Sequence, residues 1–437
     1  MILFNPVIVS VLVLCILCLV KLDVLLSLLI AAVVGGAVAG MGMGETMGHL
    51  ISGMGGSSET ALSYILLGIL AAAMEHTGAA AILARKIGAL INDRKIVLVL
   101  VLAGISCLSQ NLIPVHIAFI PIMIPPMLML MNKLQLDRRA VACALAFGLK
   151  APYIVIPAGF GMLYHTILAN NITKNGLAVS NLEIWKSTWY IGAAMLAGLL
   201  VATFVAYRKP RQYKINEAAV AQYELEQSHP TRLERNHIIT LIGAVSTLAV
   251  QLYTGSLPLG ALLGLGIMII FRAIQWQDIE KVVANGLRIM AYIAFIMLVA
   301  EGFAKVLSES GAIDQLVQFT VSASAGNKLL ASTAMVITGL VIVTGLGTSF
   351  GTVPILAVLY VPICMQLGYS VPATIMLIAA SAAIGDAGSP VSDTTLGPTA
   401  GLAVDGQHDH IWDTCVPTFI YFNIPIAICA ILMSVVL

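Results

Sequence analysis

One short segment of this sequence concentrates residues that could bind a cation. Residues 385–398 read GDAGSPVSDTTLGP and place two carboxylates, Asp386 and Asp393, among hydroxyl side chains directly after an apolar run. Carboxylate, hydroxyl and carbonyl oxygens are the ligands that a hard cation such as Na⁺ prefers. The predicted ligands of a Na⁺ site are the carboxylates and hydroxyls of this segment: Asp386, Ser389, Ser392, Asp393 and Thr394.

A lysine occupies the corresponding place in the first half of the chain. Residues 149–161 (LKAPYIVIPAGFG) are also rich in Pro and Gly, and they carry Lys150 within an apolar run. An ionisable residue at membrane depth costs at least about 2.5 kcal/mol on insertion scales and is functional by default. The Lys150 ammonium could replace a second bound cation or bind an anionic group of a substrate. In either role we expect Lys150 to face Asp386 across the pseudo-two-fold axis. Alternatively, Lys150 pairs with a carboxylate and only holds the two halves together.

Two further interruptions place polar residues between apolar segments. They are residues 109–114 (SQNLIP) and 345–354 (GLGTSFGTVP), and we predict that both are the tips of re-entrant hairpins. Unwound backbone and side-chain oxygens beside helix ends can bind Na⁺ or a substrate carboxylate; the alternative role is hydrogen bonding between helices. Tyr153, His116 and His165 lie near the interruptions and could contact a substrate or simply pack. The predicted substrate-binding residues are Ser109, Gln110, Asn111, Lys150, Ser349 and Thr352.

Other ionisable residues in apolar segments are less specific. Glu301 and Lys305 are four residues apart with the acid first, an order that favours an ion pair within one helix; a role in transport is the alternative. Glu75, followed by His76 near a predicted helix end, could relay protons or extend toward the membrane surface. Residues 405–413 (DGQHDHIWD) have the composition of a metal site, but we predict a solvated polar loop.

The composition identifies the environment of these residues. The 437-residue chain is 59% apolar and 10% charged, with a mean hydropathy of +0.98, which excludes a water-soluble enzyme. The net charge of +1 gives no indication of a nucleic-acid partner. Seven cysteines, an odd number in apolar segments, predict neither a disulfide framework nor a metal cluster. An intramembrane aspartyl protease is disfavoured because Asp386 and Asp393 lie in one segment instead of on two separate helices.

Apolar runs long enough to cross a membrane follow one another through most of the chain. An orientation that places 17 of the 22 basic residues in the cytoplasm satisfies the positive-inside rule. The single long polar segment, residues 208–236, is then a cytoplasmic linker. It divides the chain into a first transmembrane repeat, 1–207, and a second, 237–437.

The two halves resemble one another in sequence. Residues 109–115 (SQNLIPV) match 349–355 (SFGTVPI) in Ser, Pro and apolar positions, and residues 64–83 parallel 292–316. Segments 64–83 and 292–316 are each preceded by a mixed polar and apolar stretch, residues 45–59 and 276–288. We predict that each stretch is an amphipathic interfacial helix. The charge assignment puts the first stretch outside and the second inside. We therefore predict inverted-topology repeats, an architecture found in many secondary transporters.

The segment that begins at Gly385 (GDAGSPVSDTT) resembles the GD, SP and SDT elements of the NhaC-type Na⁺/H⁺ antiporter family. Residues 347–352 (GTSFGT) resemble that family's TSWGT element, with Phe350 in place of Trp. Residues 397–419 are similar to a branch regarded as amino-acid permeases, with histidine among the suggested substrates. The resemblance implies the ion transporter superfamily, whose inverted repeats carry re-entrant hairpins with Ser, Asn and Thr at their tips. Ser109 and Asn111 match that pattern, and Gln110 is additional.

The favoured function is cation-coupled secondary transport of a small organic solute, preferably an amino acid, with Na⁺ preferred over H⁺. Lys150 favours an organic substrate, because bare cation exchange has little use for a fixed positive charge. The alternative is a Na⁺/H⁺ antiporter without an organic substrate. The expected protein is an all-α, multi-pass protein of the bacterial plasma (inner) membrane without enzymatic activity, and it needs no cofactor besides Na⁺ or H⁺. Its expected partners are the solute and the lipid bilayer, with a homodimer left open.

Overall fold

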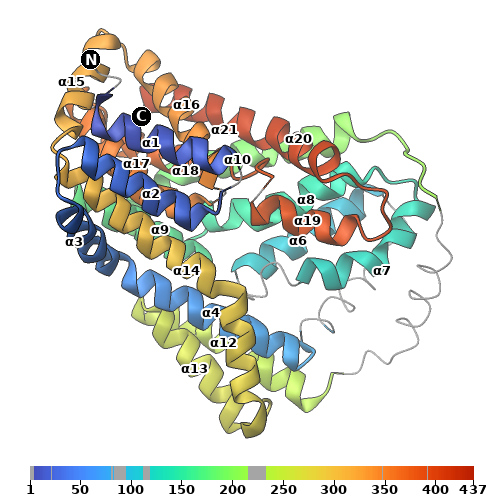
Figure 1. The fold of residues 1–437 in the computed structure, drawn as a ribbon. Coiled ribbons are helices and arrows are strands. Elements are labelled where there is room, and N and C mark those ends of the chain that lie inside the picture. The colour runs from blue at the N-terminus through green and yellow to red at the C-terminus, as the bar shows by residue number, and fades with distance from the viewer. Residues whose placement is uncertain are drawn as a thin grey trace.

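The computed structural model describes residues 4–20, 22–79, 82, 95–111, 119–214, 233–346, 348–390 and 392–437, and all secondary structure within them is helical (Figure 1). The helices of the first half are α1 (Pro6–Leu19), α2 (Val24–Val38), α3 (Met43–Met54), α4 (Ser58–His76), α6 (Lys95–Asn111), α7 (Phe119–Lys133), α8 (Arg138–Val155), α9 (Phe160–Lys174) and α10 (Asn181–Val201). Those of the second half are α12 (Arg235–Thr254), α13 (Leu257–Ile270), α14 (Ile279–Glu309), α15 (Ile313–Ala323), α16 (Lys328–Leu346), α17 (Ser349–Gln366), α18 (Val371–Ala383), α19 (Asp393–Leu402), α20 (Val416–Thr418) and α21 (Ile424–Val436). Short 3₁₀ or π turns are η2 (Gly55–Ser57), η4 (Ala202–Ala206), η5 (Trp276–Asp278), η6 (His410–Cys415) and η7 (Phe419–Asn423). The predicted all-α class is confirmed.

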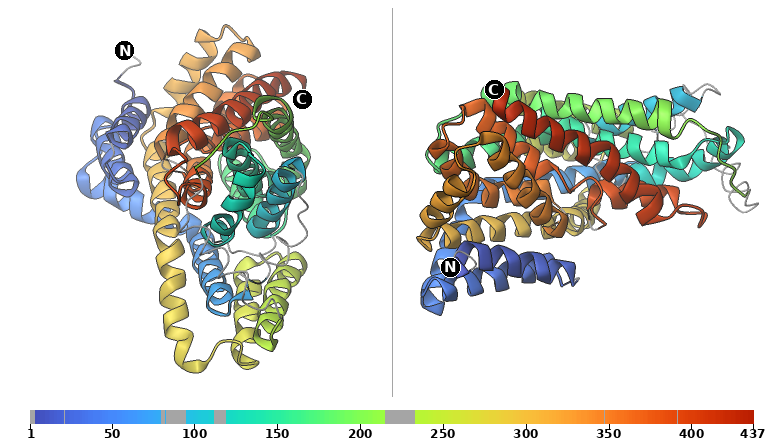
Figure 2. Two further views of the ribbon diagram at one scale, coloured as in Figure 1. Left: turned by 90° about the vertical axis from the view of Figure 1, so that its right-hand side faces the viewer. Right: turned by 90° about the horizontal axis from the view of Figure 1, so that it is seen from above.

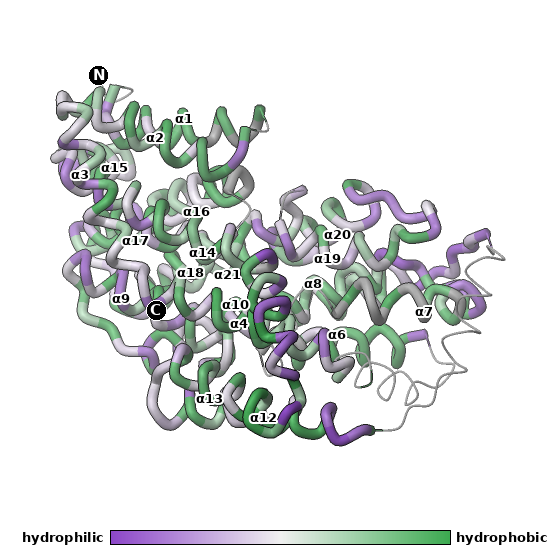
Figure 3. The backbone as a smooth tube through the Cα atoms, turned by 60° about the horizontal axis from the view of Figure 1, so that its bottom comes forward, coloured by the Kyte–Doolittle hydropathy of each residue, from purple (hydrophilic) through white to green (hydrophobic). Residues whose placement is uncertain are grey.

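The helices have the length and surface of a multi-pass membrane protein. Within the described residues, six helices are long and apolar enough to span a membrane, and the bent pair α8 and α9 makes a seventh. Apolar residues follow the helices in Figure 3, whereas hydrophilic residues gather in loops and at the start of α12. On α12 the exposed residues Ile238, Ile242, Val245 and Leu252 recur at helical spacing. An exposed apolar face of this kind is expected where lipid covers the helix.

The two halves meet along a long pair of antiparallel helices. α14 packs beside the continuous unit of α3, η2 and α4, the gold and blue helices of Figure 1, and the gold helix lies beside the blue α4 in Figure 2 (left) as well. Glycines permit the close approach: Gly286 lies against the backbone of Gly68, and Gly302 lies against the backbone of Leu50. Residue numbers therefore rise along one helix as they fall along the other.

The structure changes the interpretation of the two predicted interfacial helices. Residues 45–59 lie mostly in α3, which continues through η2 into α4. Residues 276–288 do not form a separate helix. They begin as η5 and then become the first third of the 31-residue α14. The helix continues because this stretch contains no proline and because its one glycine, Gly286, packs against α4.

The first predicted break in a membrane helix is present between α8 and α9, which meet at a bend of 50°. Gly159, at a φ of +59°, ends the irregular stretch. The Gln251 side chain of α12 accepts a hydrogen bond from the Gly159 N–H and donates one to its carbonyl, both at 3.0 Å. The His165 Nε2 lies 2.8 Å from the Ile154 carbonyl oxygen at the end of α8. Side chains thus satisfy backbone groups that a lipid environment could not.

The second predicted break separates α18 from α19. Gly385 and Gly388 adopt φ values of +90° and +105°, a region that only glycine enters readily. The Asn423 side chain, from η7, donates a hydrogen bond to the Ala387 carbonyl inside the break. Ser392 then caps α19 by accepting a hydrogen bond from the Thr394 N–H. A side-chain amide from a neighbouring helix therefore supports each of the two breaks.

The two predicted hairpin tips are described unequally. α16 ends at Leu346 and α17 begins at Ser349, so the second tip is a very short connection. The first tip lies largely outside the described residues. Of the predicted site residues there, Ser109, Gln110 and Asn111 belong to the last turn of α6, but their side chains are outside the described part of the structure.

Candidate functional site

The two broken helices meet at a buried ion pair. Lys150 Nζ, from the last turns of α8, lies 3.2 Å from Asp386 Oδ2, which follows α18. The Lys150 side chain is 0% exposed and the Asp386 side chain is 8% exposed. The ammonium makes no hydrogen bond with a described residue besides this ion pair, so it retains donors for a further ligand.

Four hydroxyl groups complete the surroundings of Asp386. Tyr153 and Ser349 donate to Asp386 Oδ2 at 3.1 and 2.7 Å. Ser392 and Thr394 donate to Oδ1, the latter at 3.3 Å. These donors come from α8, α17 and the start of α19, so the carboxylate joins three separate elements. In this conformation Asp386 is fully engaged, and a cation could coordinate it only by displacing some of these partners.

Asp393 is in a different situation. Its half-buried carboxylate forms no hydrogen bond or ion pair with any described residue, although it lies at the first position of α19. Asp386 and Tyr64 of α4 are close enough to interact with it electrostatically. Of the two carboxylates predicted to bind the cation, Asp393 is therefore the one whose negative charge is not compensated by a described residue. Ser389 is buried beneath the same turn, and its carbonyl accepts a hydrogen bond from Thr395.

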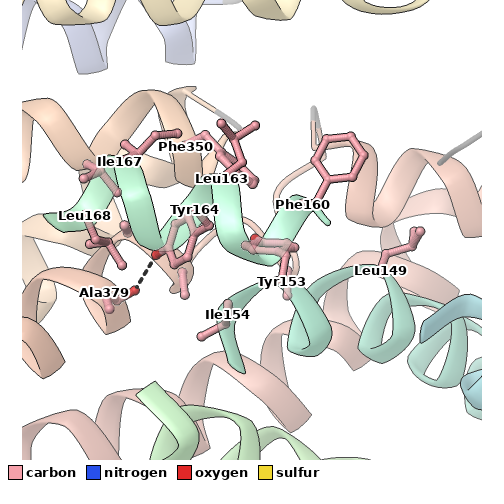
Figure 4. Packing of buried hydrophobic residues seen from close by; sticks show 14 of the residues in the cluster. Leu149, Tyr153, Ile154, Phe160, Leu163, Tyr164, Ile167, Leu168, Phe350 and Ala379 are labelled. Atoms are coloured by element: carbon pink, nitrogen blue, oxygen red, sulfur yellow. Dashed lines mark hydrogen bonds between the residues drawn. The ribbon is translucent and has the colours of Figure 1, made fainter. Parts of the chain in front are cut away.

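Aromatic rings form one wall beside the ion pair. Phe350 lies 5.0 Å from Tyr153, 5.2 Å from Tyr164 and 5.6 Å from Tyr64, measured between ring centroids. Phe160 extends the group through a contact of 5.9 Å with Tyr64. Figure 4 shows Tyr153, Tyr164, Phe160 and Phe350 around the bend of α8 and α9, with the Tyr164 hydroxyl bonded to the Ala379 carbonyl. The rings exclude water from one side of the charged groups.

The remaining predicted substrate residue lies apart from this network. Thr352 is buried on α17, but its hydroxyl donates to the Thr348 carbonyl of its own helix at 2.7 Å. Glu75 is exposed at the end of α4, and its neighbour His76 lies 3.4 Å from Asp278. Neither Thr352 nor Glu75 takes part in the hydrogen bonds around Asp386.

The predicted pair of Glu301 with Lys305 is wrong. Glu301 Oε1 lies 2.7 Å from Lys174 Nζ at the end of α9, and Ser57 also donates to the carboxylate. Lys305 pairs with Glu309 at 2.5 Å, one turn further along α14. The reason is that α14 extends to Glu309, which gives Lys305 an acidic neighbour and frees Glu301 for a partner from the other half.

The predicted solvated loop at 405–413 is also wrong in part. Asp405 accepts two hydrogen bonds from the fully buried Arg138 guanidinium at 2.7 and 2.5 Å, and Arg211 pairs with Asp413 at 2.7 Å. Burial opposes ionisation of Asp405, but the hydrogen bonds from Arg138 outweigh burial and lower its pKa. His408 is buried, which lowers its pKa to about 4. No group of three or more His, Cys, Asp or Glu side chains in the described residues could hold a metal.

Sequence reasoning missed several residues that shape the site. Tyr64 and Tyr164 were not predicted to line it, and the roles of Gln251 and Asn423 at the breaks were not foreseen. A single amide in an otherwise apolar helix is a signal that could have identified Gln251 and Asn423. A bundle of membrane-length helices in which two broken helices meet at a buried ion pair is the architecture of a membrane transporter.

The family follows from the comparison with known proteins. Residues 144–435 match the Na⁺/H⁺ antiporter family, and residues 5–91 match a further Na⁺-H⁺ antiporter family. The first match covers more than half of the chain, and the chain therefore belongs to the Na⁺/H⁺ antiporter family. The resemblance found in the sequence is confirmed, and the protein is a multi-pass, cation-coupled membrane transporter.

Three relatives match nearly the whole chain. A membrane protein of Vibrio parahaemolyticus is 44% identical over 445 residues, which cover 99% of this chain and 100% of the relative. A Bacillus subtilis protein, YuiF, whose name provisionally assigns it to amino acid transport, is 42% identical over 448 residues with the same coverage of both chains. A membrane protein of Haemophilus influenzae is 41% identical over 442 residues, with 97% of each chain covered.

Two solved structures share the fold. MtrF of Neisseria gonorrhoeae, described as an example of a class of antimetabolite efflux pumps, matches 90% of this chain and 84% of its own with a TM-score of 0.60. The YdaH transporter of Alcanivorax borkumensis, described as having an unusual topology, matches 89% of this chain and 86% of its own with a TM-score of 0.56. Each is 14% identical in sequence, so the likeness is one of fold alone.

Proposed function

We propose that the protein is a secondary transporter that couples Na⁺ to the movement of an amino acid across the bacterial inner membrane. The observation that carries this proposal is the buried pair of Lys150 and Asp386 at the meeting point of two broken helices, with the Asp393 carboxylate left uncompensated beside it. The name of the YuiF relative supports an amino acid as the solute.

The charges of the site complement those of a zwitterion and a cation. Lys150 has ammonium donors available and can bind the carboxylate of an amino acid. Asp393, with the hydroxyls of its segment, can bind Na⁺ or the solute's ammonium group. The aromatic wall around Phe350 can pack against the solute's side chain. Lys150 can therefore bind the solute carboxylate while Asp393 binds Na⁺, so ion and solute can be bound together.

Competition for Asp386 offers a physical basis for coupling. Lys150 neutralises Asp386 in this conformation, so binding of a solute carboxylate to Lys150 weakens that pair. The uncompensated charge of Asp386 then adds to that of its neighbour Asp393 and raises the affinity for Na⁺ at Asp393, because a buried carboxylate without a positive partner is strongly unfavourable. Solute and Na⁺ would thereby bind cooperatively.

Inverted repeats remain part of the proposal, and the antiparallel packing of α14 against α4 supports them.

Na⁺/H⁺ exchange without an organic solute is the second candidate. The family description favours it, as does the uncompensated Asp393, which could bind either a proton or Na⁺. The fully buried Lys150 favours the first candidate, since an exchanger of two cations gains nothing from a third positive charge that competes for Asp386.

Transport in proteoliposomes tests the proposal and separates the two candidates. Purified protein is reconstituted, and uptake of labelled amino acids is measured under an inward Na⁺ gradient and under a matched K⁺ gradient. A pH-sensitive dye inside the same vesicles reports proton movement. Na⁺-dependent uptake of an amino acid is the expected result. A Na⁺-driven pH change without uptake of any of the twenty amino acids would support plain exchange instead.

A further inference from the structure

A cavity lies at the beginning of α8, whereas Lys150 of the proposed transport site lies in the last turns of that helix. It has a volume of about 110 Å³ and opens between the start of α6, the turn that joins α7 to α8, and η4 at the end of α10. This is several times the space that one water molecule needs. Ile96, Val99 and Leu136 give it apolar walls, whereas its positive lining residues are Lys95, Arg208 and Lys209. Figure 1 shows the α7 end of the molecule at the right.

Two independent features of this cavity indicate an anionic ligand. Thr203, in its lining, is only 3% exposed, yet its hydroxyl has no hydrogen-bond partner among the described residues. Buried hydroxyls nearly always have a partner, so this one calls for a ligand or ordered water. Lys95, Arg208 and Lys209 form no ion pair with any described residue. Three uncompensated cations and a free hydroxyl donor thus surround one cavity.

The single acidic residue in the lining does not cancel this positive charge. The Asp137 carboxylate lies 2.7 Å from the Arg139 guanidinium and 3.8 Å from that of Arg211. Asp137 also accepts a hydrogen bond from the Arg139 N–H as the cap of α8. Arg139 and Arg211 therefore compensate the charge of Asp137, and the three cavity cations remain available to a ligand.

The surface beside the cavity indicates where the ligand comes from. Phe204 and Val205 follow Thr203 on η4 and are 42% and 65% exposed. An exposed apolar surface of this kind, on a helix of membrane-spanning length, faces lipid. The positive-inside rule places this end of the molecule at the cytoplasmic leaflet, where anionic lipids attract basic pockets between helices.

We propose that this cavity binds the phosphate-bearing headgroup of an anionic phospholipid. Lys95, Arg208 and Lys209 neutralise the phosphate, the Thr203 hydroxyl donates a hydrogen bond to it, and the acyl chains lie along Phe204 and Val205. The site differs from the transport site in both position and ligand. It requires neither an amino-acid substrate nor Na⁺ coupling.

Lipid binding to purified protein tests the proposal directly. The full chain in a neutral detergent is titrated with dioctanoyl phosphatidylglycerol, and bound lipid is counted by native mass spectrometry. Dioctanoyl phosphatidylcholine supplies the same chains without net charge, and glycerol phosphate supplies a headgroup without chains. The variants are Arg208→Gln/Lys209→Gln and Thr203→Val. Lys281→Gln/Arg288→Gln, which removes the same two residue types from exposed positions on α14, is the matched control.

We expect Arg208→Gln/Lys209→Gln to weaken phosphatidylglycerol binding about 25-fold, from about fivefold for each of the two charges near a membrane surface. Thr203→Val should weaken it about fivefold through one lost hydrogen bond. The Lys281/Arg288 control should bind as the native protein does. Equal losses in the control, or equal binding of phosphatidylcholine, would overturn the proposal. Glycerol phosphate binding as tightly as phosphatidylglycerol would also overturn it, because the ligand would then be a soluble phosphate compound.

Discussion

Replacement of Lys150 by methionine isolates the contribution of the buried ion pair. Methionine keeps a long unbranched side chain but removes the ammonium, which lies 3.2 Å from Asp386 Oδ2. At an effective dielectric constant of about 20, two unit charges at that distance attract by about 5 kcal/mol. Four hydroxyl donors remain around the carboxylate and offset part of the loss. We expect the free energy of unfolding to fall by about 3 kcal/mol, the lower end for loss of one partner from a buried pair.

Two companion variants give this prediction its control. Lys174→Met also removes an ion-paired lysine, and its distance to Glu301 is shorter, at 2.7 Å, but Lys174 is 48% exposed. Water screens an exposed pair, so that variant should lose at most about 1 kcal/mol. The double variant Lys150→Met/Asp386→Asn removes both buried charges and should recover most of the stability lost by Lys150→Met.

Thermal unfolding of the three purified variants, followed together with solute uptake in proteoliposomes, provides the assay. Lys150→Met and the double variant should both lose coupled uptake, because each lacks the ammonium proposed to bind the solute, although only the single variant should be strongly destabilised. Equal destabilisation by Lys150→Met and Lys174→Met would refute the reasoning, since burial would then not determine the effect. A double variant no more stable than Lys150→Met would refute it as well.

Further predictions concern the helix breaks and pH. Gln251→Leu should lower the free energy of unfolding by about 2 to 4 kcal/mol, because both polar backbone groups of Gly159 lose their partner. Denaturant unfolding measures this loss, and an unchanged midpoint denaturant concentration would contradict the prediction. Asn423→Leu should cost about half as much, since one backbone hydrogen bond is lost. Because burial lowers the pKa of His408 to about 4, the unfolded chain binds a proton there from about pH 6.5 downward while the folded chain does not. Stability should therefore fall between pH 6.5 and 4, and melting curves of His408→Gln should show a smaller fall; an identical pH profile would count against the buried, neutral histidine.

The sequence predicted those features of the site that depend on local pattern. Pro and Gly in apolar runs located both helix breaks, and the intramembrane charges identified Lys150 and Asp386, which the structure brings into contact. Ser392 and Thr394 were predicted as cation ligands and Ser349 as a substrate-binding residue, and the structure brings all three into hydrogen bonds with Asp386. Whether these residues bind ion or solute stays a prediction.

Contacts between the two halves could not be predicted from one sequence. Spacing reveals partners that are three or four residues apart on one helix, which is why Lys305 was assigned to Glu301. The actual partner, Lys174, lies on α9 in the other half. Gln251 and Gly159 are 92 residues apart, and no local pattern connects them. Such pairs depend on which helices pack together, and that information is absent from periodicity and composition.

The effect of Na⁺ on solute affinity tests the central claim most directly. If Na⁺ binds at Asp393 and is coupled to the solute, each ligand must raise the affinity for the other by the same factor. The affinity of the purified protein for its amino acid, measured by titration calorimetry, should rise about tenfold or more between Na⁺-free and Na⁺-saturated buffer. Asp393→Asn should abolish that rise, whereas Asp314→Asn, which removes an exposed carboxylate from α15, should preserve it. An undiminished Na⁺ effect in Asp393→Asn would contradict the account.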